Sequence, residues 1–239
     1  MHVPNPPIGL AYLAASLRDA NLEFCLIDGT GEALDAIHSY PHRDDFLMQG
    51  LSLEQIVRKI PEGTDIVGIG CMFSTLWPIT RMVCEAVRKK FPDATLVLGG
   101  EHGTAVYEHS LRTSEFDIVV LGEGEETFIN LVRAIRNKTP LDKVSGIAFH
   151  GPDGVKSTGL SARTRDVDSI SPPEWQSTPI EAYIDRHQIN GVKLGRSMPL
   201  LATRGCPYEC TFCSNPFMWT KRWIARDPKL VVDETEDYV

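Results

Sequence analysis

The 239-residue sequence lacks a long apolar run, an excess of basic residues and an export signal. No apolar run approaches the ~20 residues that cross a bilayer as a helix, so we expect no membrane span. Acidic residues outnumber basic ones by 32 to 24, for a formal net charge of −8. This balance disfavours a nucleic-acid partner, because proteins that bind nucleic acids normally present a basic face. Without a basic and apolar leader, free cysteines predict a reducing, cytoplasmic location.

Cysteine is scarce, and three of the six cysteines stand together. Cys206, Cys210 and Cys213 follow the spacing Cys-x3-Cys-x2-Cys within residues 203–214. Three such thiolates can hold three irons of a cubane [4Fe–4S] cluster and leave the fourth iron without a protein ligand. An open coordination position is where chemistry occurs, whereas a closed set of four ligands is usually structural. The spacing therefore indicates an enzyme or part of one.

Three other interpretations of these cysteines are weaker. A zinc site would need a fourth ligand nearby, yet no Cys or His follows Cys213, and the nearest His upstream is His187. Disulfides need an oxidising compartment, and the sequence shows no export signal that would lead to one. Inert thiols are the third alternative. We expect the remaining cysteines, Cys25, Cys71 and Cys84, to be small buried hydrophobic residues.

Short apolar runs rich in β-branched residues alternate with helical patterns along most of the chain. Continuous hydrophobicity is typical of strands covered on both faces, as in a parallel sheet. The alternation predicts right-handed βαβ units, and hence an α/β fold with a doubly wound parallel, Rossmann-like sheet. Ser52 is a suitable N-cap for one of the helices. The expected strands cover 22–27, 66–70, 95–98 and 118–121; the expected helices cover 8–20 and the stripes Leu53, Ile56, Val57 and Ile60, then Ile79, Met82, Val83, Ala86 and Val87, then Phe128, Leu131, Val132 and Ile135.

Three regions are expected in order along the chain. Residues 1–160 form the Rossmann-like domain; only residues 1–5 precede its first helix, so its start is clipped or its sheet lacks a strand. Residues 161–197 form a linker. Residues 198–239 begin a (β/α) barrel, which takes ~250 residues when complete, so they amount to about one unit. We therefore expect a fragment, or a catalytic domain completed elsewhere. Smaller elements are expected as a hairpin over 146–158, a helix over 180–187, a strand over 198–203 and a helix over 228–237.

Glycine-rich turns follow three of the expected strands. Ligands of such sheets bind at the carboxyl ends of the strands, where glycines let backbone approach a large ligand closely. The alternative is that glycine only makes tight turns, that the acidic residues favour helix N-termini, and that His102 starts a helix rather than ligating a metal. The candidate binding residues are Ser74, Thr75, Leu76, Gly99, Gly100, Glu101, His102, Gly122, Glu123, Gly124 and Glu125.

Together these features resemble the cobalamin-dependent radical S-adenosylmethionine (SAM) enzymes. The cysteine motif, with Phe212 before its last cysteine, is similar to the signature of that superfamily. Residues 6–10, 99–102 and 121–126 resemble its cobalamin-binding domain. The segment 213–228 is similar to the branch that contains the anaerobic magnesium-protoporphyrin monomethyl ester cyclase and related methyltransferases.

The resemblance implies roles for the two sets of residues. It implies that Cys206, Cys210 and Cys213 ligate a [4Fe–4S] cluster whose open iron binds SAM. An electron from a flavodoxin or ferredoxin type donor then generates a 5′-deoxyadenosyl radical, for methyl transfer to a small-molecule substrate or for oxidative cyclisation. Cobalamin is implied to sit on the loops 74–76, 99–102 and 122–125.

One departure from the wider cobalamin pattern concerns the axial ligand. The Asp-x-His-x-x-Gly motif of methionine-synthase-type cobalamin domains supplies a histidine to cobalt, and here Asp28-Gly29-Thr30-Gly31 has none. Ser74-x-Leu76 and Gly99-Gly100 do resemble the rest of that pattern. We therefore expect cobalamin bound with no protein histidine on cobalt. Two alternatives are a cobalamin-binding module without its own catalysis and a methylthiotransferase-like radical SAM protein.

Overall fold

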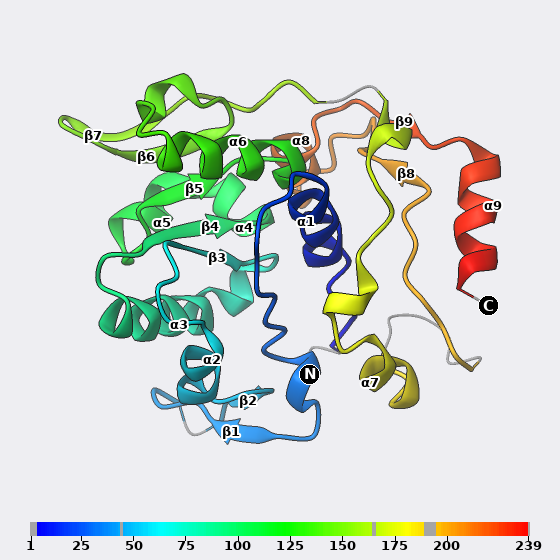
Figure 1. Cartoon of the computed structure of the whole chain (residues 1–239), viewed down its shortest axis with the longest axis horizontal. Coiled ribbons are helices and arrows are strands. Elements are labelled where there is room, and N and C mark those ends of the chain that lie inside the picture. Colours follow the sequence, from blue (N-terminus) through cyan, green and yellow to red (C-terminus); the bar gives the residue numbers. More distant parts are fainter. Residues whose placement is uncertain (1–3, 44, 164–165, 189–194, 239) are drawn as a thin grey trace. The chain divides into compact units, whose positions relative to one another are not determined.

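The structure is a computed structural model of the whole chain, and it divides into two compact units, which Figure 1 draws together. Each unit gathers segments that are distant in sequence, so the units do not follow the linear division expected above, which stays a prediction. The described residues are 4–43, 45–163, 166–188 and 195–238. The first unit comprises Met1–Pro61, Ser171–Leu201 and Pro228–Val239, and the second comprises Glu62–Ile170 and Ala202–Asp227.

The second unit is built on a five-stranded sheet with strand order β3-β4-β5-β6-β7. Strands β3, β4 and β5 run parallel, β6 pairs antiparallel with β5, and β7 pairs antiparallel with β6. The α/β class is confirmed, but the sheet is mixed rather than wholly parallel, because the expected hairpin joins its edge. A tight turn can only connect antiparallel strands. The strands are β3 (Ile66–Gly70), β4 (Thr95–Gly99), β5 (Ile118–Val120), β6 (Ile147–Gly151) and β7 (Gly154–Ser157).

Helices that follow the parallel strands cover this sheet (Figure 1). The α6 helix presents Leu131, fully buried, to a core that includes Val97, Ile118 and Ile147. Burying such a side chain contributes about 1.5–3 kcal/mol, so this contact is a main support of the unit. The expected stripe of α6 is confirmed. The helices are α3 (Trp77–Lys90), α4 (Glu101–Ala105), α5 (Tyr107–Arg112) and α6 (Gly124–Arg136).

The buried face of α3 differs from the expected stripe. Only Val87 of the expected residues is buried, and the others are half-buried. Trp77, Thr80 and Cys84 complete the buried face, and the Trp77 ring stacks on Phe116 with centroids 6.2 Å apart. The expectation was wrong in phase because the face is made by one large aromatic, one small thiol and one threonine, none of which marks a simple aliphatic stripe.

The remainder of the second unit, residues 202–227, is here named the cysteine segment. Its regular elements are short: β8 (Thr203–Arg204), α8 (Asn215–Met218) and β9 (Ile224–Ala225), with β8 antiparallel to β9. The expected strand over 198–203 is wrong except at Thr203, because Pro199 has no backbone N–H to donate to a ladder. No closed barrel occurs in the part of the chain that the structure describes.

The first unit holds helices with few strands. The α2 helix begins at a capping box, in which Ser52 Oγ accepts from Gln55 N at 3.2 Å and Gln55 Oε1 accepts from Ser52 N at 2.8 Å. Such a cap contributes about 1 kcal/mol. The remaining expected helices are confirmed. The elements are α1 (Ile8–Asp19), β1 (Ile37–Ser39), β2 (Leu47–Gln49), α2 (Leu53–Lys59), α7 (Ile180–Asp185) and α9 (Pro228–Asp237).

The expected strand over 22–27 is wrong. Its side chains alternate between half-buried and exposed, as in a strand, but its backbone is assigned to no sheet. A strand is defined by a partner for its N–H and C=O groups, which composition cannot supply. Cys25 is accordingly exposed rather than buried, whereas Cys71 and Cys84 are buried as expected. The 3-10 turns are Gly31–Ala33, Ser74–Leu76, Leu141–Lys143, Val167–Ser169 and Trp175–Ser177.

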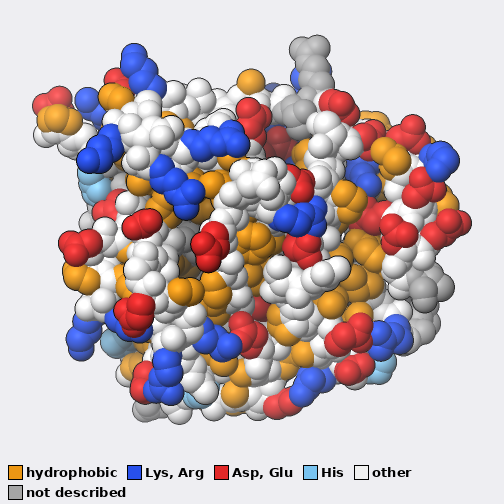
Figure 2. Space-filling model, in the orientation of Figure 1, with side chains coloured by type: hydrophobic (Ala, Val, Ile, Leu, Met, Phe, Trp, Pro, Cys, Tyr) orange, Lys and Arg blue, Asp and Glu red, His pale blue; other side chains and the backbone are white. Residues whose placement is uncertain are grey.

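No helix among the described residues has the length and apolarity to cross a membrane. On the face drawn in Figure 2, Lys and Arg side chains are interspersed with Asp and Glu side chains. The surface charge of this face is therefore mixed, in agreement with the composition.

Candidate functional site

The loops after β3, β4 and β5 begin at the same edge of the sheet, and we name residues 71–76, 99–104 and 121–125 the edge loops. Gly70 pairs with Gly99 in register, and Cys71 N donates to Gly99 O at 2.9 Å. Gly100 has φ 95°, and a Cβ there would lie 2.7 Å from Cys71 O, so only glycine fits. A Cβ on Gly99 would meet no atom within 4 Å, so the edge is open at that point.

His102 and Ser74 come together from two edge loops. Ser74 Oγ lies 2.9 Å from His102 Nδ1, and the imidazole lies against the Trp77 ring with centroids 4.7 Å apart. His102 is buried, and burial, together with His109, lowers its pKa. Its Nε2 atom is buried without a partner among the described residues. His102 thus lies in the first turn of α4, as the alternative expected, but it is buried rather than at the surface; Thr75 is exposed.

Thr104 joins the second edge loop to the third. Its buried hydroxyl oxygen accepts from Gly122 N at 3.0 Å and donates to Gly100 O at 3.1 Å. The same hydroxyl lies 3.5 Å from Met218 Sδ in α8. Thr104 is not among the residues predicted from sequence, although a hydroxyl four residues after Gly100 on a helix is the usual position for such a bond.

The cysteine motif occupies an exposed loop. All three thiols are free; Cys210 and Cys213 are exposed, and Cys206 is half-buried. Cys213 N donates to Cys210 O at 3.0 Å, and Asn215 N points to Cys213 Sγ at 3.5 Å. Within the described residues, no three His, Cys, Asp or Glu side chains are gathered in an arrangement that could hold a metal ion. The donor set fits an iron–sulfur cluster in its chemistry, but the thiols are not drawn together.

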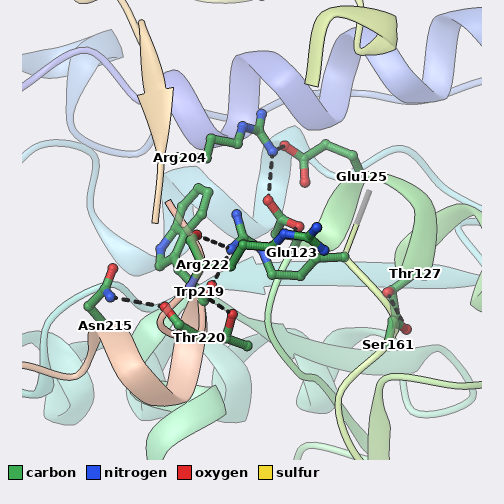
Figure 3. A network of polar contacts seen from close by, with 10 residues as sticks. Glu123, Glu125, Thr127, Ser161, Arg204, Asn215, Trp219, Thr220 and Arg222 are labelled. Carbon is green, nitrogen blue, oxygen red and sulfur yellow. Dashed lines mark hydrogen bonds and ion pairs between the residues drawn. The ribbon is translucent and has the colours of Figure 1, made fainter. Parts of the chain in front are cut away.

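A buried ionic network lies between the third edge loop and the start of the cysteine segment (Figure 3). Glu123 accepts from Arg163 Nε at 3.2 Å and from Arg204 Nη1 at 3.3 Å. Glu125 lies 2.7 Å from Arg204 Nη1. Burial opposes the charge on Arg204, but the two carboxylates outweigh it and raise its pKa. We name Glu123, Glu125, Arg163 and Arg204 the Glu123 network.

Arg163 also binds the far end of the cysteine segment. Its Nη1 donates to Arg222 O at 2.7 Å and to Trp219 O. The guanidinium carbons of Arg163 and Arg204 lie 5.7 and 5.5 Å from the centre of the Trp219 ring. Figure 3 shows Arg204 and Trp219 close to Glu123. Sequence reasoning named both glutamates but missed both arginines. The available signal was an Arg two residues before Cys206 in a chain with an acidic pair in a predicted binding loop.

A further contact joins the cysteine segment to the second edge loop. Ser214 Oγ donates to Glu101 Oε1, and α8 packs on α4. Ser214 directly follows Cys213 in the chain. The structure therefore places all three edge loops and all three motif cysteines in one compact unit, with contacts between the two sets on both sides of the motif.

Asp28, the first residue of the incomplete axial-ligand motif, has a different role in the first unit. Its carboxylate accepts from Gly31 N at 2.9 Å and from Tyr183 Oη at 2.8 Å. Burial raises the pKa of Asp28, although these hydrogen bonds oppose the rise. The carboxylate thus fixes a buried turn against α7, and Thr30 donates its backbone N–H to the same group at 3.2 Å.

Comparison with known families and sequences gives consistent results. Residues 2–132 match the B12 binding domain family. The anaerobic magnesium-protoporphyrin IX monomethyl ester cyclase of Rubrivivax gelatinosus is 34% identical over 97% of this chain and 38% of its own length. That of Cereibacter sphaeroides is 32% identical over 98% of this chain and 35% of its own. The cytidylyl-2-hydroxyethylphosphonate methyltransferase of Streptomyces wedmorensis is 29% identical over 95% of this chain and 47% of its own. The chain therefore spans about a third to a half of the length of these relatives.

Two solved structures share the fold. The radical SAM methyltransferase TsrM of Kitasatospora setae, with cobalamin and a [4Fe–4S] cluster bound, matches with a TM-score of 0.66 at 19% identity, over 99% of this chain and 43% of TsrM. The cobalamin-dependent SAM radical enzyme OxsB, with aqua-cobalamin and SAM bound, matches with a TM-score of 0.73 at 18% identity, over 98% of this chain and 29% of OxsB. At these identities the likeness establishes the fold.

Proposed function

The chain belongs to the B12 binding domain family, and from this membership we propose that it is the cofactor-bearing part of a cobalamin-dependent radical SAM methyltransferase or cyclase. One observation carries the proposal: the edge loops and the motif cysteines lie in a single unit, joined through Glu101 to Ser214 and through Glu123 to Arg204. Matched relatives that are methyltransferases and cyclases support an enzymatic role.

The edge loops would hold cobalamin. The open position above Gly99 and the register of β3 with β4 present backbone from neighbouring loops at one edge. Buried His102 carries a ring nitrogen without a partner among the described residues, which suits a polar ligand. The residues proposed to make contact are Ser74, Thr75, Leu76, Gly99, Gly100, Glu101, His102, Gly122, Glu123, Gly124 and Glu125.

Cobalamin binding is tested by equilibrium dialysis of the full chain with hydroxocobalamin. Gly99→Leu places a side chain in the open position, and we expect it to weaken binding at least about tenfold, the equivalent of about 1.4 kcal/mol. Gly9→Leu is a matched control, because a Cβ on Gly9 also meets nothing within 4 Å and lies in α1. Equal binding by the two variants would remove the edge loops from the proposal.

Cys206, Cys210 and Cys213 would hold the [4Fe–4S] cluster, with SAM on the iron that has no protein ligand. When bound, these cofactors supply the electron transfer and the radical or methyl chemistry. The residues of the chain hold and orient them. A flavodoxin or ferredoxin type protein as electron donor and a small molecule as substrate complete the proposal.

We further propose that no protein histidine binds cobalt. Thr30 stands where the axial histidine of other cobalamin domains lies, and Asp28 is used in a buried turn. His102 is the nearest rival, because its Nε2 has no partner among the described residues. Electron paramagnetic resonance of the Co(II) form decides: splitting by a protein nitrogen that disappears in His102→Phe would make His102 the ligand.

A cobalamin carrier without its own catalysis is the second candidate. The observation that favours it is that the described residues gather no three side chains suited to a metal. Anaerobic reconstitution with iron and sulfide, followed by an assay for 5′-deoxyadenosine, separates the two. Cobalamin binding together with SAM cleavage supports the enzyme, and cobalamin binding with neither cluster nor cleavage supports the carrier.

A further inference from the structure

The Glu123 network contacts residues on both sides of the cysteine motif. Arg204 stands two residues before Cys206, and its guanidinium binds Glu123 and Glu125. After Cys213, the carbonyls of Trp219 and Arg222 accept from Arg163, which itself binds Glu123. Glu123 is therefore the common acceptor through which both flanks of the cysteine loop, residues 206–213, connect to one edge loop (Figure 3).

The network is buried and balanced in charge. The side chains of Arg204, Arg163 and Glu123 are only 4%, 8% and 14% exposed, and two carboxylates face two guanidinium groups. Attraction between charges strengthens as water is excluded, and a buried charge that loses its partner is strongly disfavoured. A displacement of Glu123 must therefore be followed by both arginines or be resisted by them.

Gly205, the one residue between Arg204 and the cysteine motif, is closely surrounded by other atoms. Gly205 has φ 81°, and a Cβ there would lie 2.0 Å from Arg222 O and 3.0 Å from Arg163 Nη1. The residue directly before Cys206 is thus packed against a carbonyl that Arg163 holds. Gly205 is the single residue between Arg204 and Cys206, and its close packing joins the network directly to the first motif cysteine.

We infer that the Glu123 network couples the two cofactor sites, so that occupation of the edge loops positions the cysteine loop for its metal, and the reverse. The inference rests on the proposed function. Glu123 directly follows Gly122 in the third edge loop and precedes α6, so a ligand bound to this loop lies next to Glu123 and restricts its position. Coupling between two binding sites is reciprocal, and each ligand changes the affinity for the other by the same factor. Arg163 and Arg204 are in this sense positioning residues, because they act through the cysteine segment, whereas Glu123 belongs to the edge loop that is proposed to contact cobalamin.

The test measures the dissociation constant of hydroxocobalamin for the full chain with and without its reconstituted cluster. We expect cobalamin to bind about tenfold more tightly to the cluster-loaded protein, within the usual range for coupled sites. Glu123→Gln keeps the shape of the side chain but removes the charge, and it should reduce this ratio to about one. Arg222→Ala is the control, because the network uses only the carbonyl of Arg222 and its side chain is exposed; the ratio should be kept.

A second measurement needs no variant. Backbone amide exchange over residues 203–222 is followed in the cluster-free chain on addition of hydroxocobalamin. We expect exchange of these amides to slow at least about threefold, although cobalamin is not proposed to contact most of them. Unchanged exchange in a chain that does bind cobalamin overturns the coupling, even where Glu123→Gln fails to fold.

The outcomes separate the inference from the function on which it rests. A ratio of one in the parent protein, or the same ratio in parent and Glu123→Gln, contradicts the coupling and leaves the proposed function in place. A parent chain that is folded and binds no cobalamin contradicts the proposed function itself. The inference is supported if cobalamin binds more tightly to the cluster-loaded protein in the parent and in Arg222→Ala, but equally tightly with and without the cluster in Glu123→Gln.

Discussion

The edge loops and the cysteine segment are in one unit, yet they differ in how they are supported. Two of the edge loops continue from β4 and β5, whose side chains are largely buried, such as Leu98 and Val119. The first continues from β3, which is half-buried to exposed, and ladder register sets the positions of all three. The cysteine segment has strands of two residues, and Phe212 within its motif is 90% exposed. The sheet itself thus supports the edge loops, whereas the cysteine segment has little regular structure of its own. Under the proposed function, cluster binding would add to the stability of that segment, as at other sites whose binding energy is also folding energy.

The sharpest test of this difference is removal of a motif thiol. We expect Cys213→Ala to lose the cluster entirely on reconstitution, while the cluster-free protein unfolds within about 0.5 kcal/mol of the parent, because Cys213 is exposed. Iron and sulfide content and urea unfolding measure the two effects. Cys25→Ala, also a free and exposed cysteine, should change neither. Retention of a full cluster by Cys213→Ala would assign the iron ligands elsewhere.

The opposite pattern is expected for a core residue between α6 and the sheet that carries the edge loops. Leu131→Ala should lower the free energy of unfolding by about 3 kcal/mol, because Leu131 is fully buried and its removal leaves a cavity. The control Val106→Ala alters a side chain that is 39% exposed and should cost less than about 0.5 kcal/mol. Urea unfolding of the cluster-free protein measures both. Equal costs would mean that the sheet does not support its loops as described.

This contrast also explains what could be predicted from sequence. The runs at 95–98 and 118–121 became buried strands, because continuous apolar residues suit a covered sheet, and Phe128 to Ile135 marked α6. The run at 66–70 is also a strand, but its residues are half-buried or exposed, so there the expected cover on both faces was wrong. The run at 22–27 has the same composition but no ladder partner, and partners are set by tertiary structure. The motif cysteines and the glutamates of the edge loops could be named from spacing. Arg163 could not, because its partners are carbonyls that lie 56 and 59 residues away in the chain.

Comparison of Gly205, in the cysteine segment, with Gly159, outside it, distinguishes the cost of backbone strain from the cost of steric crowding. Gly205 and Gly159 have similar φ values of 81° and 76°, but a Cβ would lie 2.0 Å from a carbonyl oxygen at Gly205 and would meet nothing within 4 Å at Gly159. Alanine should cost about 1–2 kcal/mol at either site from the left-handed backbone. Gly205→Ala should cost more than Gly159→Ala and should also speed amide exchange at residues 203–206. Identical behaviour of the two variants would show that Arg222 does not press on this turn.

The smallest effect is expected in the pH dependence of the edge loops. Burial lowers the pKa of His102 in the folded protein, so the unfolded chain binds that proton more tightly, with a pKa of about 6.5. The contribution of neutral His102 to stability is therefore complete above about pH 6.5 and is lost as the pH falls through the lower folded pKa. His102→Phe, which can still pack on Trp77, should reduce the loss of stability on acidification. Unfolding free energies from pH 7.5 down to pH 5, an interval about the reference pKa, measure it; an unchanged slope would mean that His102 is not the group that titrates.

The central claim is that one unit of this chain holds cobalamin on its sheet edge and a [4Fe–4S] cluster on its cysteine loop. The most direct measurement is the cobalt and iron content of the full chain after anaerobic purification and reconstitution with hydroxocobalamin, iron and sulfide. The account predicts about one cobalt and about four irons in each chain, as a single cobalamin and a single cubane cluster require. A folded chain that retains neither metal would contradict it.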